Sequence, residues 1–121
     1  MMVLVDTSVW IDHFRAALPG LAEALGRQDI LIHPLVIGEL ACGNLKRRVQ
    51  TLADLRALPR TTEATFDECL NMIELHSLYG KGLGWNDLEL LASARLASAW
   101  LWSTDKRLRE AAQELRISYT P

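Results

Sequence analysis

Short runs of mostly apolar residues alternate along the chain with longer stretches whose apolar positions recur at helical spacing. Residues 2–5, 30–32, 99–102 and 117–119 are short runs rich in β-branched or aromatic side chains, and each predicts a strand. The stretches between them predict helices. Strands that alternate with helices are typical of a parallel sheet covered by helices. We therefore expect an α/β fold with a central parallel sheet.

Proline, glycine and capping residues divide the helical stretches. We expect helices over residues 9–15, 19–26, 35–42, 45–58, 65–79, 86–98 and 105–115. Thr65 opens one of them with a capping-box pattern, and Gly80 supplies its stop. Asn86 and Glu89 form a second such pattern, which would place Asp87 at the first helical position.

Length and composition favour a single domain over residues 1–121. Of the 121 residues, 50% are hydrophobic, which suits one shared core. Residues 90–102 come closest to a membrane span, but Arg95 interrupts them and no apolar run is long enough. The N-terminus shows neither a basic leader nor a cleavage site. Cys42 and Cys69 lie far apart without metal spacing, so we expect free thiols in a reducing, cytoplasmic compartment and no contact with membrane.

The formal charge of −2 gives no sign of the basic surface that most nucleic-acid-binding proteins carry. A site built from carboxylates and divalent cations is an exception. There the cation meets the phosphate, and the acidic residues are its ligands. The charge therefore leaves metal-dependent nucleic-acid chemistry open.

Two aspartates follow predicted strands, where functional groups gather in parallel α/β sheets. Asp6 ends the first strand, and Asp105 follows the strand at residues 99–102. Either aspartate may simply cap the helix after it. Thr7 or Ser8 in the first case, and Thr104 in the second, are alternative caps that would leave both carboxylates available.

Two further acids are candidates for the same site. Asp87 gains from the helix dipole near a helix start without being needed as the cap, so it either stabilises the helix or points into a cleft. Glu39 lies in the otherwise apolar run 35–42. It either occupies an exposed stripe, pairs with an arginine, or coordinates a cation. Several carboxylates at one edge would repel each other, and one or two Mg²⁺ or Mn²⁺ ions would relieve that repulsion.

Four motifs in series resemble those of PIN-domain nucleases, and in particular VapC-type toxins. They are residues 3–11 with Asp6, residues 38–40 with Glu39, residues 84–94 with Asp87, and residues 101–108 with Ser103 and Asp105. The resemblance covers nearly the whole chain, in the family's order and at its spacing. It implies a three-layer α/β/α domain with a central parallel sheet.

The resemblance also implies an activity and partners. In this family the matching acids bind Mg²⁺ or Mn²⁺ and support RNA hydrolysis. Asp6 and Asp87 would then be metal ligands, and Glu39 and Asp105 would complete the site directly or through water. Ser103 would orient a ligand or water by a hydrogen bond. A homodimer and a cognate antitoxin that blocks the active site are implied as well.

Basic and aromatic residues near these motifs have two interpretations each. Residues 46–48 (Lys-Arg-Arg), together with Lys106, Arg107 and Arg109, either contact RNA phosphates or form solvated helix faces. Trp85 is the aromatic residue best placed for exposure near RNA. The three histidines are scattered, which argues against a zinc site.

Two other functions start from the same residues. An aspartate at a strand end is also found in aspartate-nucleophile phosphatases, but these usually have a second aspartate two positions later, where this chain has Ser8. A non-catalytic module could use an acidic cleft to dock a basic partner peptide. Such a module would bind its partner without metal and would cleave nothing.

Overall fold

A three-stranded parallel sheet forms the centre of the computed structural model, which describes all 121 residues. Strand β1 (Val3–Val5) lies between β2 (Ile30–Leu31) and β3 (Trp100–Trp102). In the register, Val3 pairs with Ile30 on one side and with Trp100 on the other. The middle strand is buried throughout, which agrees with the apolar run that predicted it.

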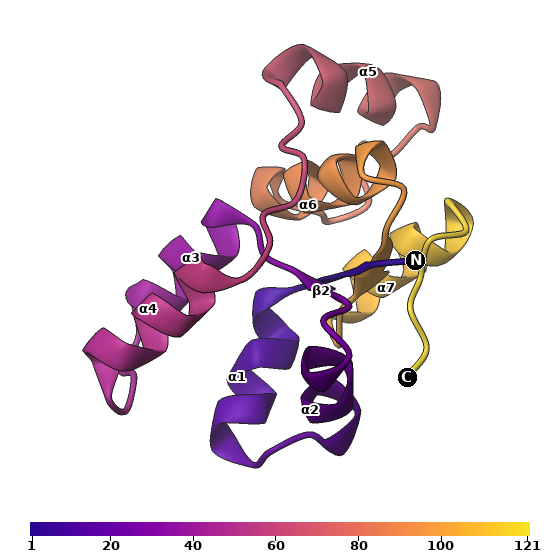
Figure 1. Ribbon diagram of the computed structural model, residues 1–121. Helices are drawn as coiled ribbons and strands as arrows, with labels where there is room; N and C mark the ends of the chain where they lie inside the picture. The colour runs from indigo at the N-terminus through magenta and orange to yellow at the C-terminus, as the bar shows by residue number, and fades with distance from the viewer.

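Seven helices surround the sheet, as Figure 1 shows. They are α1 (Thr7–Arg15), α2 (Pro19–Gly26), α3 (Pro34–Ala41), α4 (Arg48–Ala57), α5 (Phe66–Leu75), α6 (Trp85–Leu96) and α7 (Lys106–Glu114). Pro19 and Pro34 each occupy the first turn of a helix, where a missing N–H costs nothing. No helix is both long and apolar enough to span a membrane.

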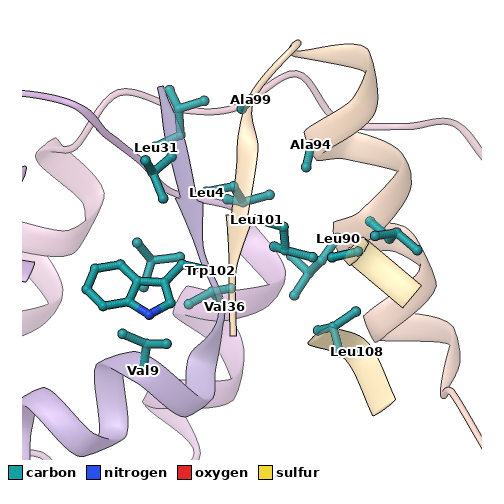
Figure 2. Packing of buried hydrophobic residues seen from close by; sticks show 14 of the residues in the cluster. Leu4, Val9, Leu31, Val36, Leu90, Ala94, Ala99, Leu101, Trp102 and Leu108 are labelled. Atoms are coloured by element: carbon teal, nitrogen blue, oxygen red, sulfur yellow. The ribbon is translucent and has the colours of Figure 1, made fainter. Parts of the chain in front are cut away.

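The helices cover both faces of the sheet and make three layers. Figure 2 shows Val9 of α1 beside Trp102 on one side of the strands, and Leu90 of α6 and Leu108 of α7 on the other, near Leu101. Side chains that alternate along β3 therefore enter two different layers of the core. Helix α5 packs outside α6, and α4 packs against α3. The expected α/β/α fold with a parallel sheet is confirmed.

Two isolated bridges widen the sheet beyond its three strands. Ile32 pairs with Arg60, and Leu101 pairs with Ser118, both in parallel orientation. The predicted strand at residues 117–119 is thus present only as a single bridge, fixed by hydrogen bonds from Leu101 N to Ile117 O (2.7 Å) and from Tyr119 N to Leu101 O (2.9 Å). The ring of Tyr119 lies 5.1 Å from that of Trp102, which holds the tail against β3.

Several helix boundaries differ from their predictions, among them the start of α4 at Arg48 instead of residue 45, and two of the differences have a clear physical cause. Helix α5 has the expected capping box at Thr65 but ends at Leu75, because Ser77 takes a left-handed conformation with φ of 51°. That turn carries Leu78 into the core, where it is 1% exposed, so burial offsets the cost of the strained residue. Helix α6 begins at Trp85 with Gly84 as its N-cap, and the capping box predicted from Asn86 was wrong.

Candidate functional site

The candidate acids stand around the carboxyl end of the sheet. Asp6 directly follows β1, and Ser103 and Asp105 follow the neighbouring strand β3. The backbone joins these ends, since Asp6 N donates to Trp102 O at 2.9 Å. Glu39 comes from α3 and Asp87 from the first turn of α6. The topology therefore brings acids from four segments to one edge of the sheet.

Asp6 is buried and held by two serine hydroxyls. Its side chain is 6% exposed, and its Oδ2 accepts hydrogen bonds from Ser103 Oγ at 2.8 Å and from Ser8 Oγ at 2.7 Å. Asp6 occupies the N-cap position of α1 but makes no side-chain capping bond. The carboxylate is therefore directed toward the sheet edge by side chains and is not used to begin the helix.

The two serines also bind the loop that follows β3. Ser8 Oγ accepts a hydrogen bond from Thr104 N at 3.1 Å, and Ser103 Oγ accepts one from Asp105 N at 3.0 Å. Each hydroxyl thus accepts from the loop and donates to Asp6. Ser103 was predicted to orient a ligand, but Ser8 was considered only as a helix cap. The signal for Ser8 was its position two residues after an aspartate, where a hydroxyl can reach back to the carboxylate.

Glu39 projects from the exposed side of α3. The helix buries only Val36 and Leu40, and Glu39 lies on its exposed stripe, which was one of the three interpretations of this residue. Glu39 makes no ion pair with an arginine, and its Oε1 accepts a hydrogen bond from Thr7 Oγ1 at 3.1 Å. Partial burial raises the pKa of Glu39, the bond from Thr7 lowers it, and the nearby charges of Asp6 and Asp87 raise it further.

Asp87 lies at the third position of α6 instead of the first. Its Oδ2 accepts a hydrogen bond of 3.3 Å from the backbone N–H of Gly84, which is the half of a capping box that glycine permits. Burial raises the pKa of Asp87, the bond from Gly84 lowers it, and the charges of Asp6 and Asp105 raise it. Asp87 is therefore within electrostatic reach of two other candidate acids.

Asp105 does cap the helix that follows it. Its Oδ1 accepts a hydrogen bond of 3.0 Å from Leu108 N at the start of α7. The expectation that Thr104 would take this place was wrong, because the backbone N–H of Thr104 is bound to Ser8 and its hydroxyl makes no capping bond. The second oxygen, Oδ2, takes no part in the cap, and the residue is exposed.

The charge balance of this edge suits a cation. None of the three ion pairs in the structure involves Asp6, Glu39, Asp87 or Asp105. No three of them are close enough to hold one ion by direct contact alone. All four residues offer carboxylate oxygens, which are the ligands that Mg²⁺ and Mn²⁺ prefer. Mg²⁺ typically binds one or two carboxylates and keeps several of its water ligands. The donor set therefore fits a hydrated divalent cation better than a dehydrated one.

The neighbouring basic and aromatic residues separate into different roles. Arg107 reaches across the loop before α6, with its Nη1 3.5 Å from Gly82 O. Lys81 of the same loop pairs with Glu114 at 2.9 Å. Trp85, 39% exposed, is the first residue of α6 and stacks on Phe66 with ring centroids 5.1 Å apart. Contacts with Arg107 and Glu114 thus hold the loop that precedes Asp87 against α7, and the Phe66–Trp85 pair lies beside this loop.

Comparison with known proteins agrees with this architecture. The sequence pattern of the PIN domain matches residues 3–114. Two relatives called Ribonuclease VapC32, from two strains of Mycobacterium tuberculosis, are 47% identical over 118 residues, which is 97% of this chain and 95% of each relative. The crystal structure of PAE2754 from Pyrobaculum aerophilum has a TM-score of 0.61 at 16% identity, covering 91% of this chain and 78% of that one, and supports the fold alone. The chain therefore belongs to the PIN-domain family and is a VapC-type member of it.

Proposed function

We propose that this protein is an endoribonuclease that depends on Mg²⁺ or Mn²⁺ and acts as the toxin of a toxin–antitoxin pair. The observation that carries the proposal is the convergence of Asp6, Glu39, Asp87 and Asp105 on the carboxyl end of the sheet, where none of them has an ion-pair partner. Burial first, and then the charges of neighbouring acids, raise the pKa of Glu39 and that of Asp87. Like charges gathered without a compensating cationic side chain favour a bound divalent ion. The name of the relatives, Ribonuclease VapC32, supports RNA as the substrate.

Four acids would hold the ion, Asp6 and Asp87 as direct ligands and Glu39 and Asp105 as ligands that bind directly or through water. Asp6 has its two serine bonds on Oδ2 and offers Oδ1. Asp87 offers the oxygen that Gly84 does not bind. Glu39 and Asp105 would complete the site directly or through water, since Mg²⁺ accepts water readily in place of protein oxygens. Bound Mg²⁺ or Mn²⁺ would supply the positive charge that activates water and stabilises the charge developing on the phosphodiester.

The remaining residues position these carboxylates. Ser8 and Ser103 fix the rotamer of Asp6 by donating to a single oxygen. Thr7 holds Glu39 by one hydrogen bond, which favours the charged carboxylate. The loop bonds to Ser8 and Ser103 keep Asp105 near Asp6. Ser103 is thus a positioning residue in this mechanism, and its effect reaches the substrate through Asp6.

RNA cleavage with defined cations tests the proposal. The protein is incubated with RNA in Mg²⁺, in Mn²⁺ and in a chelator, and is compared with Asp6→Asn and Asp87→Asn. We expect cleavage only with a divalent ion, and a loss of about a hundredfold or more in each variant, because each removes a charged ligand. Asp67→Asn, an exposed aspartate in the first turn of α5, is the matched control and should cleave normally. Undiminished cleavage by both site variants would refute the assigned site.

The toxin role is tested separately in cells. Expression of the intact protein should arrest growth, and co-expression of the neighbouring gene should relieve the arrest. The Asp6→Asn variant should leave growth unaffected while still binding the antitoxin. We further propose that the protein is a homodimer and that it acts in the cytoplasm. Sedimentation of the purified protein tests the oligomeric state, and a monomer would contradict the proposed homodimer.

A non-catalytic module that docks a basic peptide is the alternative. It is favoured by the absence of three carboxylates at direct ligating distance. It predicts partner binding in the presence of a chelator and no RNA cleavage under any cation. Metal-dependent cleavage that is lost in Asp6→Asn would exclude it.

A further inference from the structure

Buried polar groups join the two helices that carry Glu39 and Asp87. His33 is 2% exposed, and Ser93 is completely buried. Nε2 of His33 lies 3.2 Å from Ser93 Oγ, which also accepts a hydrogen bond of 3.0 Å from Ala64 N. None of the four acids at the sheet edge shares in these bonds. The His33–Ser93 pair is therefore separate from the candidate site, although it connects two of the segments that build it.

The backbone of α3 fixes the proton of His33. His33 is the N-cap of this helix, and its Nδ1 accepts a hydrogen bond of 3.0 Å from Leu35 N. Because a nitrogen that accepts carries no proton, the neutral ring is protonated at Nε2. Nε2 therefore donates to Ser93 Oγ. Burial lowers the pKa of His33 and favours this neutral ring, with the charge of Glu63 opposing it and that of Arg60 assisting it.

The pair lies at similar distances from two of the candidate acids. His33 precedes Glu39 by six residues, and Ser93 follows Asp87 by six residues in α6. At the rise of an α-helix, each separation is about 9 Å along the axis. The bond between His33 and Ser93 is the one hydrogen bond that joins residues 33–42 to residues 85–96. It therefore relates one acid-bearing helix directly to the other.

Helix α3 depends on such contacts because little of it is buried. Of its eight residues, only Val36 and Leu40 are buried, and Arg48 holds its last turn by donating to two carbonyl oxygens. A tilt of about 10° about the first residue of the helix would move Glu39 by about 1.5 Å. Functional groups must be held within about 0.5 Å of their working positions. The His33–Ser93 pair is placed to prevent a tilt of α3 away from α6.

Stability alone does not require a polar pair at this place. Replacing both partners of a buried hydrogen bond by apolar groups of the same shape is often neutral for stability. A satisfied buried network instead selects one arrangement of the segments that it joins. Nδ1 of His33 binds the backbone of α3 while Nε2 binds Ser93 of α6, so a single orientation of the ring serves both helices. The imidazole thus sets where α3 begins relative to α6.

We propose that His33 and Ser93 are positioning residues that hold Glu39 at the distance from Asp87 that a divalent cation needs. The inference rests on the proposed cation site at the sheet edge. Neither residue touches the cation or the RNA, because both act through the placement of Glu39. A purely structural role would lower the free energy of unfolding and leave the Mn²⁺ affinity of the folded protein unchanged.

Binding of Mn²⁺ to the full chain without RNA is measured at neutral pH from the electron paramagnetic resonance signal of the free ion. His33→Asn keeps an oxygen that can cap α3 but is too short to reach Ser93. Ser93→Ala keeps the cap and removes the hydroxyl. Each should weaken Mn²⁺ binding about threefold or more, which is less than the loss of about 10–100-fold for groups that contact a ligand directly.

A matched control removes a buried hydroxyl that bonds to nothing. Thr61 is buried and its Oγ1 has no partner, so Thr61→Val should bind Mn²⁺ like the native protein. Urea unfolding of each variant shows that it is folded during the titration. If Ser93→Ala does not fold, Ser93→Cys replaces it, since a thiol has a similar size and is a weaker acceptor, and the same direction of change is expected.

A double-mutant cycle shows whether the pair acts through Glu39. In a Glu39→Gln background, Ser93→Ala should weaken Mn²⁺ binding less than it does in the native background, because the charged carboxylate to be placed is already gone. A loss of the same size in both backgrounds would overturn the inference. Such a result would show that the pair affects the cation without positioning Glu39.

The other outcomes are distinct. Native Mn²⁺ affinity in both His33→Asn and Ser93→Ala would overturn the inference even if both variants are less stable, because the pair would then only stabilise the fold. A native protein that binds no Mn²⁺ would overturn the proposed cation site and the inference with it. Mn²⁺ binding that depends on the pair, without cleavage of RNA, would support the inference and overturn the nuclease function alone.

Discussion

Thr7 Oγ1 donates a hydrogen bond of 3.1 Å to Glu39 Oε1 and so connects the first residue of α1 to the exposed side of α3. Thr7 is 9% exposed, and its neighbour Asp6 bonds to different hydroxyls. Two adjacent residues therefore hold two acids of the same site by separate contacts. The contact between Thr7 and Glu39 can be removed without touching Asp6.

The first prediction concerns that contact. Thr7→Val keeps the shape of the side chain and removes the donor. Because the bond from Thr7 lowers the pKa of Glu39, the pKa should rise further in the variant. Carbon NMR titration of the Glu39 carboxyl measures this shift. Thr7→Ser retains the hydroxyl and should titrate like the native protein, and an identical titration in Thr7→Val would show that the bond has no influence.

The second prediction concerns stability against pH without divalent ions. Burial first, and then neighbouring acids, raise the pKa of Glu39 and Asp87 above the unfolded values of about 4. These groups bind protons more tightly in the folded state, so their stabilising contribution is complete below the unfolded pKa. It is lost as the pH rises through the raised folded pKa. The difference in unfolding free energy between native protein and Glu39→Gln should therefore shift in favour of the variant toward neutral pH.

Divalent cations should remove that difference. A cation that binds the folded state among the acids offsets their repulsion and stabilises the fold by mass action. Urea unfolding at neutral pH with and without Mg²⁺ should show stabilisation of the native protein and a smaller effect in Glu39→Gln. Equal stabilisation of the two proteins would show that Glu39 takes no part in holding the ion.

The third prediction concerns the buried histidine at the start of α3. His33 is 2% exposed, its Nδ1 accepts from Leu35 N at 3.0 Å, and its Nε2 lies 3.2 Å from Ser93 Oγ. Burial is the main cause that lowers the pKa of His33, with the charge of Glu63 opposing it. The unfolded chain thus binds the proton more tightly, so stability is full above about 6.5 and falls as the pH decreases toward the lowered folded pKa.

Denaturant unfolding between neutral and mildly acidic pH measures this loss. In His33→Gln the part of the pH dependence due to His33 should disappear, whereas it should persist in His76→Gln, a matched change at a less buried histidine. His33→Gln should also be less stable at neutral pH by about 1–3 kcal/mol, because it disturbs a helix cap and a buried hydrogen bond. Equal pH profiles for the two variants would contradict the assignment.

The fourth prediction concerns the glycine beneath Arg107. Gly82 has φ of 76°, and a Cβ there would lie 2.5 Å from Arg107 Nη1. Gly82→Ala should cost about 1–2 kcal/mol for the backbone and an added amount for displacing the guanidinium. In an Arg107→Ala background only the backbone cost should remain. Thermal or urea unfolding of the four proteins gives the coupling, and Gly26→Ala, where no atom lies within 4 Å of the new Cβ, is the control.

The sequence predicted the framework and the acids for the same physical reason. A short apolar run rich in β-branched residues, such as the one that became β1, favours a buried strand, and polar residues after parallel strands meet at one edge. The neighbourhood of Asp6 and Asp105 followed from that rule alone. Their metal-binding roles remain predictions, since charge and geometry are compatible with them without testing them.

Side-chain partners and helix ends could not be predicted in the same way. Whether Asp105 or Thr104 caps α7 depends on the loop bonds to Ser8 and Ser103, which join segments far apart in sequence. Helix α5 ends at Leu75, before the left-handed Ser77, because burial of Leu78 offsets the strain that a non-glycine residue has in this conformation. Such long-range contacts depend on the complete fold, so they cannot be predicted from the local pattern of residues in the sequence.

The hydrogen bond between Ser103 and Asp6 spans 97 positions of the chain. Strand β3, which carries Ser103 to the edge, is in turn paired through Leu101 with Ser118 in the final segment. Both Asp6 and Ser103 must therefore leave the ribosome before this wall of the pocket can form. Nascent chains that end before Ser103 lack the hydroxyl that holds Asp6, so the pocket cannot assemble in them.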